Sequence, residues 1–119
     1  MQSLNRALLC GTVTSAGRIR SFSTRQGRTL CFELMTGVPG SGRCEYHTVI
    51  ARDSRRDLLA SRSEGFVAPG STVFVTGAIR YRTRAGYGAS KVTEIDATAI
   101  DPVLPVVQEV EDCHAQSLP

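Results

Sequence analysis

The 119-residue sequence predicts an all-β fold, a five-stranded barrel with one helix between its third and fourth strands. Turn-forming residues recur at short intervals, and the segments between them are rich in β-branched and aromatic residues, which favour strands. One mid-chain segment departs from this pattern, because an aspartate precedes a run with adjacent leucines that is typical of a short helix. The length is that of a single domain with a core large enough to fold without disulfides.

The first three strands are expected in the N-terminal half of the chain. The first covers residues 5–15, and the second covers residues 18–23 and continues past a turn into residues 29–36. A glycine-rich loop over residues 37–42 leads to a third strand over residues 44–52. Glycine and proline in this loop interrupt regular structure between the two strands.

A short helix is expected directly after the third strand. Asp53 has the residue type of an N-cap, whose side chain accepts hydrogen bonds from the unpaired N–H groups of the first turn. The helix is then expected over residues 54–62, with Leu58 and Leu59 as its apolar contacts.

The C-terminal half is expected to return to strands. A turn at Pro69–Gly70 precedes a long alternating strand over residues 71–84, a hairpin tip at residues 85–88 and a last strand over residues 90–100. Five strands with a single helix between the third and fourth form the layout of an OB-fold barrel, here with an extended hairpin between the fourth and fifth strands. A β-sandwich fits less well, because it would have more strands and no helix in mid-chain.

Charge divides the chain into two parts. Residues 1–101 hold all 14 basic residues and 8 of the 11 acidic ones, whereas residues 102–119 hold three acidic residues and no basic one. We therefore expect an OB-fold domain over residues 1–101 and a short, acidic, flexible tail over residues 102–119. The excess of basic residues in residues 1–101 predicts an anionic partner, although codon usage in a GC-rich genome would also raise the arginine content.

Membrane and secretory classes are not expected. The longest apolar runs are a few residues, far short of the ~20 residues that a spanning helix needs. The N-terminal residues also lack the basic and then apolar layout of a signal peptide. We therefore expect a cytoplasmic protein without membrane association.

The four cysteines predict neither a disulfide framework nor a metal site. Cys10 and Cys31 lie within apolar stretches, where a free thiol is expected to be a small buried apolar group. Cys44 and His47 have a C-x-x-H spacing, and Cys113–His114 adds two more possible ligands, but adjacent residues do not easily face one ion together. We expect reduced, unlinked thiols and no metal.

The segment Arg80-Tyr81-Arg82-Thr83-Arg84 is the strongest sign of a function. Side chains alternate on a strand, so Arg80, Arg82 and Arg84 are expected to point to one side. Three guanidinium groups on one side repel one another unless an anion or solvent lies between them, and a phosphate backbone supplies such anions. The alternative is a solvated edge strand whose charges prevent aggregation.

Aromatic residues near this segment offer surfaces on which bases stack. Tyr81 and Tyr87 lie near the hairpin and Tyr46 lies on the third strand, although a single tyrosine is more often a packing residue. His47 is accompanied by neither a nucleophile motif nor paired carboxylates, so we expect neither an enzyme nor a cofactor.

The sequence resembles the bacterial-type single-stranded DNA-binding proteins. The resemblance covers about residues 4–101, and its order and spacing are more specific than any one motif. The similar segments are Leu4–Gly11, Phe32–Thr36, Glu45–Ile50, Pro69–Arg80 and Thr93–Ile95. The resemblance implies an OB fold that binds single-stranded DNA non-specifically by stacking and a basic groove, in the nucleoid, during replication, repair or recombination.

The resemblance also implies which residues contact DNA and which contact another subunit. Tyr46 matches a stacking aromatic residue of the family, and Arg80 and Arg82 match its basic hairpin. His47 matches a histidine near the subunit contact, and we expect Asn5 at this contact as well. The residues expected to bind single-stranded DNA are Tyr46, Arg52, Arg80, Tyr81, Arg82, Arg84, Tyr87, Lys91, Arg18 and Arg20. A homotetramer is expected, with a dimer as the alternative.

The sequence also departs from this family. It contains no tryptophan, and Arg52 and Arg84 stand where members of the family often stack an aromatic residue. The acidic C-terminal tip that ends in an aromatic residue is absent, so recruitment of replication or repair proteins through such a tip is not expected. The alternative function is that of a primosome-type OB subunit, which mainly docks other replication proteins.

Overall fold

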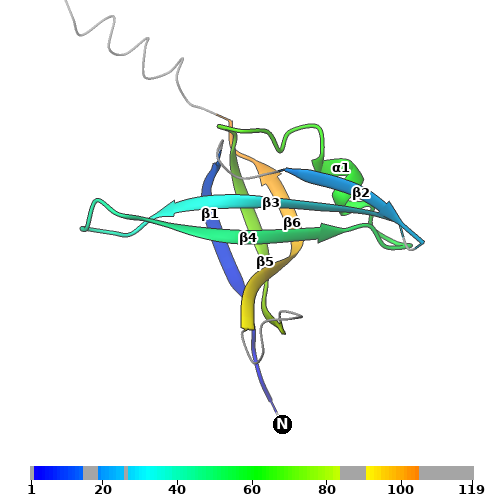
Figure 1. Cartoon of the computed structure of the whole chain (residues 1–119), viewed down its shortest axis with the longest axis horizontal. Coiled ribbons are helices and arrows are strands. Elements are labelled where there is room, and N and C mark those ends of the chain that lie inside the picture. The colour runs from blue at the N-terminus through cyan, green and yellow to red at the C-terminus, as the bar shows by residue number, and fades with distance from the viewer. Residues whose placement is uncertain (1, 15–18, 26, 84–90, 105–119) are drawn as a thin grey trace, which may run out of the picture.

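The computed structural model describes residues 2–14, 19–25, 27–83 and 91–104, which form one curved sheet with a short helix (Figure 1). The elements are β1 (Ala7–Val13), β2 (Arg20–Thr24), β3 (Gly27–Gly37), β4 (Cys44–Arg52), α1 (Leu59–Ser63), β5 (Thr72–Thr83) and β6 (Lys91–Pro102). The strand order is β1-β5-β6-β4-β3-β2, and an additional pairing between β1 and β3 closes the sheet into a barrel. The predicted all-β barrel with one helix in mid-chain is therefore confirmed.

The second predicted strand consists of two strands, which is why the sheet has six strands rather than five. β2 and β3 pair antiparallel, from Arg20 opposite Cys31 to Thr24 opposite Gly27. Gly27 has a φ of 127°, which side chains rarely permit, and it turns the chain between the two strands. The chain reverses at this turn instead of continuing as one interrupted strand.

Two hairpins extend beyond the barrel. β3 and β4 pair as far as Gly37 opposite Cys44, and they form the long arm on the left of Figure 1. β5 and β6 pair as far as Thr83 opposite Lys91, in agreement with the extended hairpin expected before the last strand. The expected hairpin tip at residues 85–88 lies outside the described residues, as does most of the expected tail over residues 102–119.

The helix is shorter than predicted, and Asp53 is not its N-cap. The hydroxyl of Ser54 accepts the backbone N–H of Asp57 at 3.1 Å, and this local bond holds a turn, so that α1 begins only at Leu59. Leu58 is exposed rather than packed, whereas Leu59 is buried as expected. No helix within the described ranges is long and apolar enough to cross a membrane.

Asp53 nevertheless binds the start of this helix from the end of β4. Its carboxylate accepts the backbone N–H of Ser61 at 2.9 Å and also accepts the hydroxyl of Ser61. These hydrogen bonds, the hydroxyl first, lower the pKa of Asp53 from its ordinary value of 3.8. The carboxylate therefore satisfies an unpaired donor of the first turn without occupying the N-cap position.

The core lies inside the barrel and is closed at one end by α1. Phe32, Leu30 and Leu34 of β3 are its largest fully buried side chains, and alternate residues of the other strands face them. Leu59 and Ala60 of α1 belong to the same cluster. Five strands, β1, β3, β4, β5 and β6, thus contribute side chains to the core, and the alternate side chains of these strands point outward.

The barrel closes where two glycines allow backbones to approach. A Cβ at Gly11 of β1 would collide with the carbonyl oxygen of Met35 in β3, and a Cβ at Gly77 of β5 would collide with that of Asp96 in β6. A larger residue at either position would push neighbouring strands apart. The sheet therefore depends on glycine at these two close contacts.

Cys10 is exposed, contrary to the prediction, whereas Cys31 is buried as predicted. Cys10 lies on β1, where the half-buried Leu9 alternates with the exposed Leu8 and Cys10. An apolar run on a strand with only one side facing the core places every second residue in solvent.

Candidate nucleic-acid interface

One side of the sheet, here called the outer face, carries the side chains of β2, β3, β4, β6 and β5 that point away from the core. The inward positions are fixed by buried residues such as Phe32 and Val49, so their neighbours along each strand point outward. The register joins one outward row across five strands, Arg20, Cys31, Ile50, Asp96 and Ala78. The outer face therefore lies on the broad surface of the sheet.

Four arginines from three strands lie on the outer face. Arg20 belongs to β2 and Arg52 to β4, while Arg80 and Arg82 follow each other at alternate positions of β5. All four are exposed. Residues that are far apart in the sequence are thus brought onto one surface by the sheet.

These arginines have carboxylate partners within the chain, which corrects the expectation that only an external anion or solvent separates them. Asp96 of β6 lies between β4 and β5, with Arg52 at 2.8 Å and Arg80 at 3.8 Å. Glu94 lies 3.0 Å from Arg82. These ion pairs depend on the neighbouring strand β6, which the alternation of the arginine strand does not reveal.

Three aromatic side chains are exposed on the strands that carry these arginines. Tyr46 of β4 is 59% exposed and lies opposite Met35 on the arm, and Tyr81 of β5 is 69% exposed but points to the side opposite Arg80. The third, Phe22 of β2, is 45% exposed and was not predicted. The available signal was its spacing, because Phe22 follows Arg20 by two residues on a strand and therefore shares its side.

A hollow of about 240 Å³ lies on the outer face at the end of β2. Its lining includes Phe22, Arg52 and Asp53. The register places Thr29 of β3 between Phe22 and Arg52, so these three residues form one row across β2, β3 and β4. The hollow thus combines an aromatic ring with a guanidinium group.

The two predicted subunit-contact residues have partners within the chain. The side-chain amide of Asn5 donates to the carbonyl oxygen of Ile79 at 2.7 Å and accepts its N–H at 2.9 Å. Nε2 of His47 lies 2.8 Å from the hydroxyl of Thr36, and the ring is half-buried. These contacts hold the segment before β1 to β5 and hold β4 to β3, and the subunit contact stays a prediction.

Three of the predicted DNA-binding residues, Arg18, Arg84 and Tyr87, lie outside the described residues. Lys91 is described, and it lies exposed at the start of β6, opposite Thr83. Tyr46, Arg52, Arg80, Arg82 and Arg20 share the outward side of the sheet, while Tyr81 lies on the other side of the hairpin. The sheet therefore unites most, but not all, of the described predicted residues.

Metal binding has no support among the described side chains. Cys44 and His47 line one hollow together, of about 530 Å³, but residues 2–14, 19–25, 27–83 and 91–104 contain no group of three or more His, Cys, Asp or Glu suited to a metal ion. Cys113 and His114 lie outside these residues.

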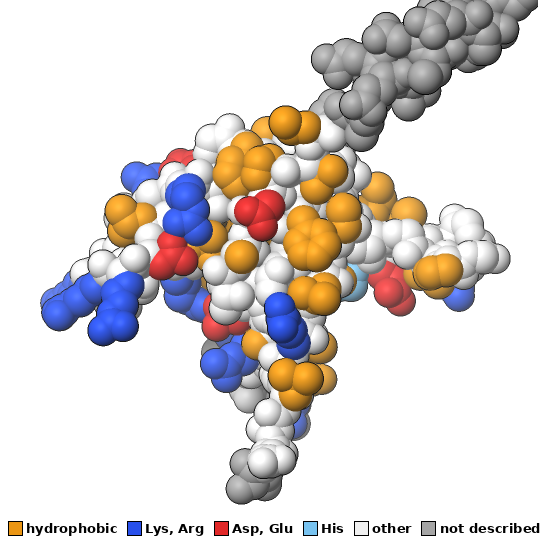
Figure 2. Space-filling model, turned by 180° about the vertical axis from the view of Figure 1, so that it is seen from behind, with side chains coloured by type: hydrophobic (Ala, Val, Ile, Leu, Met, Phe, Trp, Pro, Cys, Tyr) orange, Lys and Arg blue, Asp and Glu red, His pale blue; other side chains and the backbone are white. Residues whose placement is uncertain are grey.

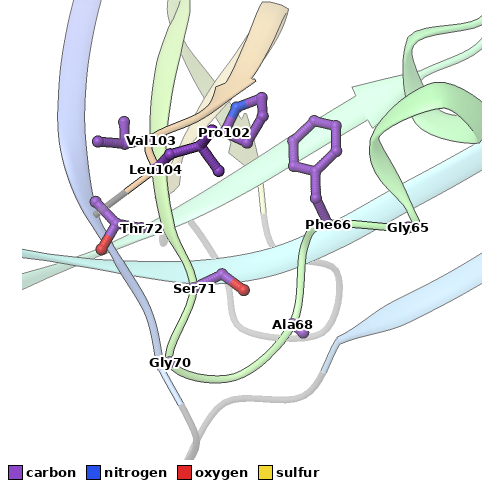
Figure 3. Close-up of a pocket in the computed structure, with 9 residues that line it drawn as sticks. All are labelled: Gly65, Phe66, Ala68, Gly70, Ser71, Thr72, Pro102, Val103 and Leu104. Carbon is purple, nitrogen blue, oxygen red and sulfur yellow. The ribbon is translucent and has the colours of Figure 1, made fainter. Parts of the chain in front are cut away.

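A hollow of about 490 Å³ lies between the segment after α1 and the end of β6 (Figure 3). Phe66, Pro102 and Leu104 project toward it. The nine described residues that line it include no charged side chain. It therefore lacks the positive groups that a phosphate-rich ligand requires.

An apolar patch covers the back of the molecule, over β1 and β5. Figure 2 shows hydrophobic side chains gathered in the middle of this view, with basic side chains toward its edges. Leu8 and Cys10 of β1 and Phe74 of β5 are exposed, and the register places Cys10 opposite Phe74. The back of the barrel thus differs in chemistry from the outer face.

Comparisons with known proteins identify the fold of this chain. No protein-family model and no curated protein matches the chain. Among solved structures, the chain is similar to a Plasmodium falciparum SSB (single-stranded DNA-binding protein) in complex with single-stranded DNA, with a TM-score of 0.64, 19% identity, and coverage of 87% of this chain and 96% of that chain. The chain has the OB fold of the single-stranded DNA-binding proteins.

A second solved structure agrees at higher identity. A deletion mutant of the single-stranded DNA-binding protein from Thermus aquaticus matches with a TM-score of 0.61 and 25% identity, over 87% of this chain. The match covers 52% of the Thermus chain, so this chain spans about half of its length. The resemblance found in the sequence is therefore confirmed at the level of the OB fold.

Proposed function

We propose that this chain binds single-stranded DNA without sequence specificity, through the outer face of its OB fold. The observation that carries the proposal is the convergence of Arg20, Arg52, Arg80 and Arg82, from three strands, on one exposed surface. Arginines on a broad sheet neutralise a flexible phosphate backbone, and exposed aromatic rings beside them stack with bases of any sequence. Protection of single strands during replication, repair or recombination, in the cytoplasm at the nucleoid, is the role that follows.

The proposed path of the strand follows the charges. It runs along the outer face from Arg20 past Arg52 to the hairpin of β5 and β6, where Arg80, Arg82 and Lys91 lie. Tyr46 supplies a stacking surface on the arm, and Tyr81 supplies one on the other side of the hairpin. Arg18, Arg84 and Tyr87 complete the set of residues that we propose to contact DNA.

The carboxylates of Glu94 and Asp96 shape this binding. Phosphates must compete with them for Arg52, Arg80 and Arg82, so the intrinsic affinity of the arginines is reduced until a strand is bound. Competition of this kind favours a ligand with closely spaced phosphates over a single anion. The paired arginines are therefore compatible with binding to a polyanion.

The test measures binding of a labelled oligothymidine to the double variant Arg80→Gln/Arg82→Gln. We expect the affinity to fall at least tenfold and the salt dependence to become shallower, because two phosphate contacts are lost. The matched control is Arg55→Gln/Arg56→Gln, which changes net charge equally at two exposed residues in the turn before α1. Equal binding by wild type and the Arg80/Arg82 variant would contradict the proposal.

We further propose that the chain forms a homo-oligomer, a tetramer or else a dimer. The apolar patch of Leu8, Cys10 and Phe74 supports self-association, because such a patch costs free energy in water. β1 pairs with β3 only at Thr12 and Val13, so most of one edge of β1 is available to another strand. His47 and Asn5 remain candidates for residues near the contact.

A second candidate function rests on the same carboxylates. A subunit that docks other replication proteins through its barrel would need fewer free arginines, and Asp96 and Glu94 pair three of the four on the outer face. Weak DNA binding together with a stoichiometric complex with a replication or repair protein would support this function over the first.

A further inference from the structure

We infer that the hollow between Phe22 and Arg52 is a binding subsite for one nucleobase of a single strand. The inference rests on the proposed function and adds to it a subsite, an aromatic residue and a mode of contact. Phe22 and Arg52 both line the hollow, which measures about 240 Å³. Neither the charge pattern nor the tyrosines pointed to it.

The spacing of the strands suits a base. Phe22 and Arg52 lie in one row with Thr29 between them, so their backbones are separated by two strand spacings, about 10 Å in total. A flat ring that contacts a partner on each side at about 3.5–4 Å needs about 7–8 Å between the two partners. The central position holds a buried threonine, which is small enough to form a floor between the two larger groups.

Arg52 is held in a manner that favours stacking. Its Nη1 donates to Asp96 at 2.8 Å, on the side of β4 away from Phe22. A guanidinium bound along one edge keeps both of its planar surfaces open, and such a plane stacks on a base with a cation–π contribution. Asp96 therefore positions Arg52, while Phe22 supplies the opposite surface.

The other charged groups of the hollow are engaged with neighbours. Arg28 lies 3.1 Å from Glu64 and also donates to Ser21, and Asp53 binds Ser61 at the start of α1. These contacts fix the walls of the hollow. The residues that offer an open plane to a ligand are thus Phe22 and Arg52.

A unique fluorophore provides the test. The chain contains no tryptophan, so Phe22→Trp creates the only indole of the protein. Leu104→Trp is the matched control, since Leu104 is also an exposed apolar residue but lies after β6, at a hollow lined by no charged side chain. Each variant is titrated with oligothymidine, while the anisotropy of a labelled oligothymidine reports binding independently.

We expect the emission of Phe22→Trp to fall over the same concentrations at which anisotropy reports binding, and that of Leu104→Trp to stay unchanged. Phe22→Ala should weaken binding about tenfold, equivalent to about 1.4 kcal/mol, and Leu104→Ala less than twofold. Arg52→Lys retains the charge but lacks the plane, so affinity should fall about threefold or more with the salt slope unchanged.

Two further outcomes separate the subsite from the proposed function. If the wild type binds oligothymidine but the emission of Phe22→Trp does not change and Phe22→Ala binds as tightly as wild type, the subsite is overturned and the proposed function stands. If the wild type itself does not bind oligothymidine, the proposed function and the subsite are both overturned.

Discussion

A guanidinium nitrogen of Arg82 lies 3.0 Å from the carboxylate of Glu94, whose side chain is only 10% exposed. The two residues lie on paired strands, with Glu94 directly opposite Arg80 and diagonal to Arg82. Arg80 makes the same diagonal contact with Asp96, which is far more exposed. The same diagonal arrangement therefore occurs once with a buried carboxylate and once with an exposed one.

This difference predicts unequal effects on stability. Arg82→Met should lower the free energy of unfolding by about 1–3 kcal/mol, because it leaves the buried Glu94 without its charged partner. Arg80→Met should cost less than about 1 kcal/mol, since its pair is long and exposed. Urea unfolding of both variants measures the difference, and equal losses would show that Glu94 does not depend on Arg82.

Removing the carboxylate that two arginines share should strengthen DNA binding. Asp96→Asn frees Arg52 and Arg80 for phosphates, and we expect oligothymidine to bind about fivefold more tightly at low salt. The log–log salt slope should steepen by about 0.7 if one further phosphate is neutralised. Asp57→Asn is the control, because it frees Arg62 beside α1 with the same change in net charge. An equal gain in the control would indicate a general effect of charge.

The contributions of the two exposed tyrosines to binding should depend differently on the length of the single strand. Tyr46 shares the outward side of the sheet with Arg52, whereas Tyr81 lies on the opposite side of the hairpin from Arg80. For an oligothymidine of about 8 nucleotides, Tyr46→Ala should cost about 1–3 kcal/mol of binding and Tyr81→Ala little. For a strand several times longer, both should weaken binding. Equal losses on the short ligand would contradict the proposed path.

Closure of the barrel predicts the effect of a single methyl group. Gly77→Ala places a Cβ against the carbonyl oxygen of Asp96 and the Cα of Ala97, both backbone atoms, so β5 and β6 must separate. We expect a loss of about 1–3 kcal/mol in the free energy of unfolding. Gly65→Ala is the control, because nothing lies within 4 Å of its added Cβ, and it should change stability by less than about 1 kcal/mol. Thermal or urea unfolding checks both variants, and a neutral Gly77→Ala would be the contrary result.

Much of the fold could be predicted from local patterns. The alternation of apolar and polar residues predicts the long strand β5. The sequence also predicts a turn at Gly27, but not that the chain reverses there to form the separate strands β2 and β3. The start of the helix was misplaced because Ser54 binds Asp57 locally, and a sequence pattern does not decide between a turn and a first helical turn.

The candidate site was predictable strand by strand, but its contacts were not. The alternation of Arg80 and Arg82 was visible in the sequence, whereas their pairing with Asp96 and Glu94 depends on the register between β5 and β6. Phe22 was missed for the same reason, since its relation to Arg52 exists only through the intervening Thr29. Cross-strand neighbours are set by tertiary structure, which a single sequence does not display.

Selective binding of single strands is best tested by the anisotropy of a labelled oligothymidine, compared with a duplex of equal length at low and at moderate salt. We expect tight binding to the single strand alone, with a log–log salt slope of about −4 if about six phosphates are neutralised. Equal and weak binding to both ligands would rule out the proposed function, because the outer face would then lack any preference for single strands.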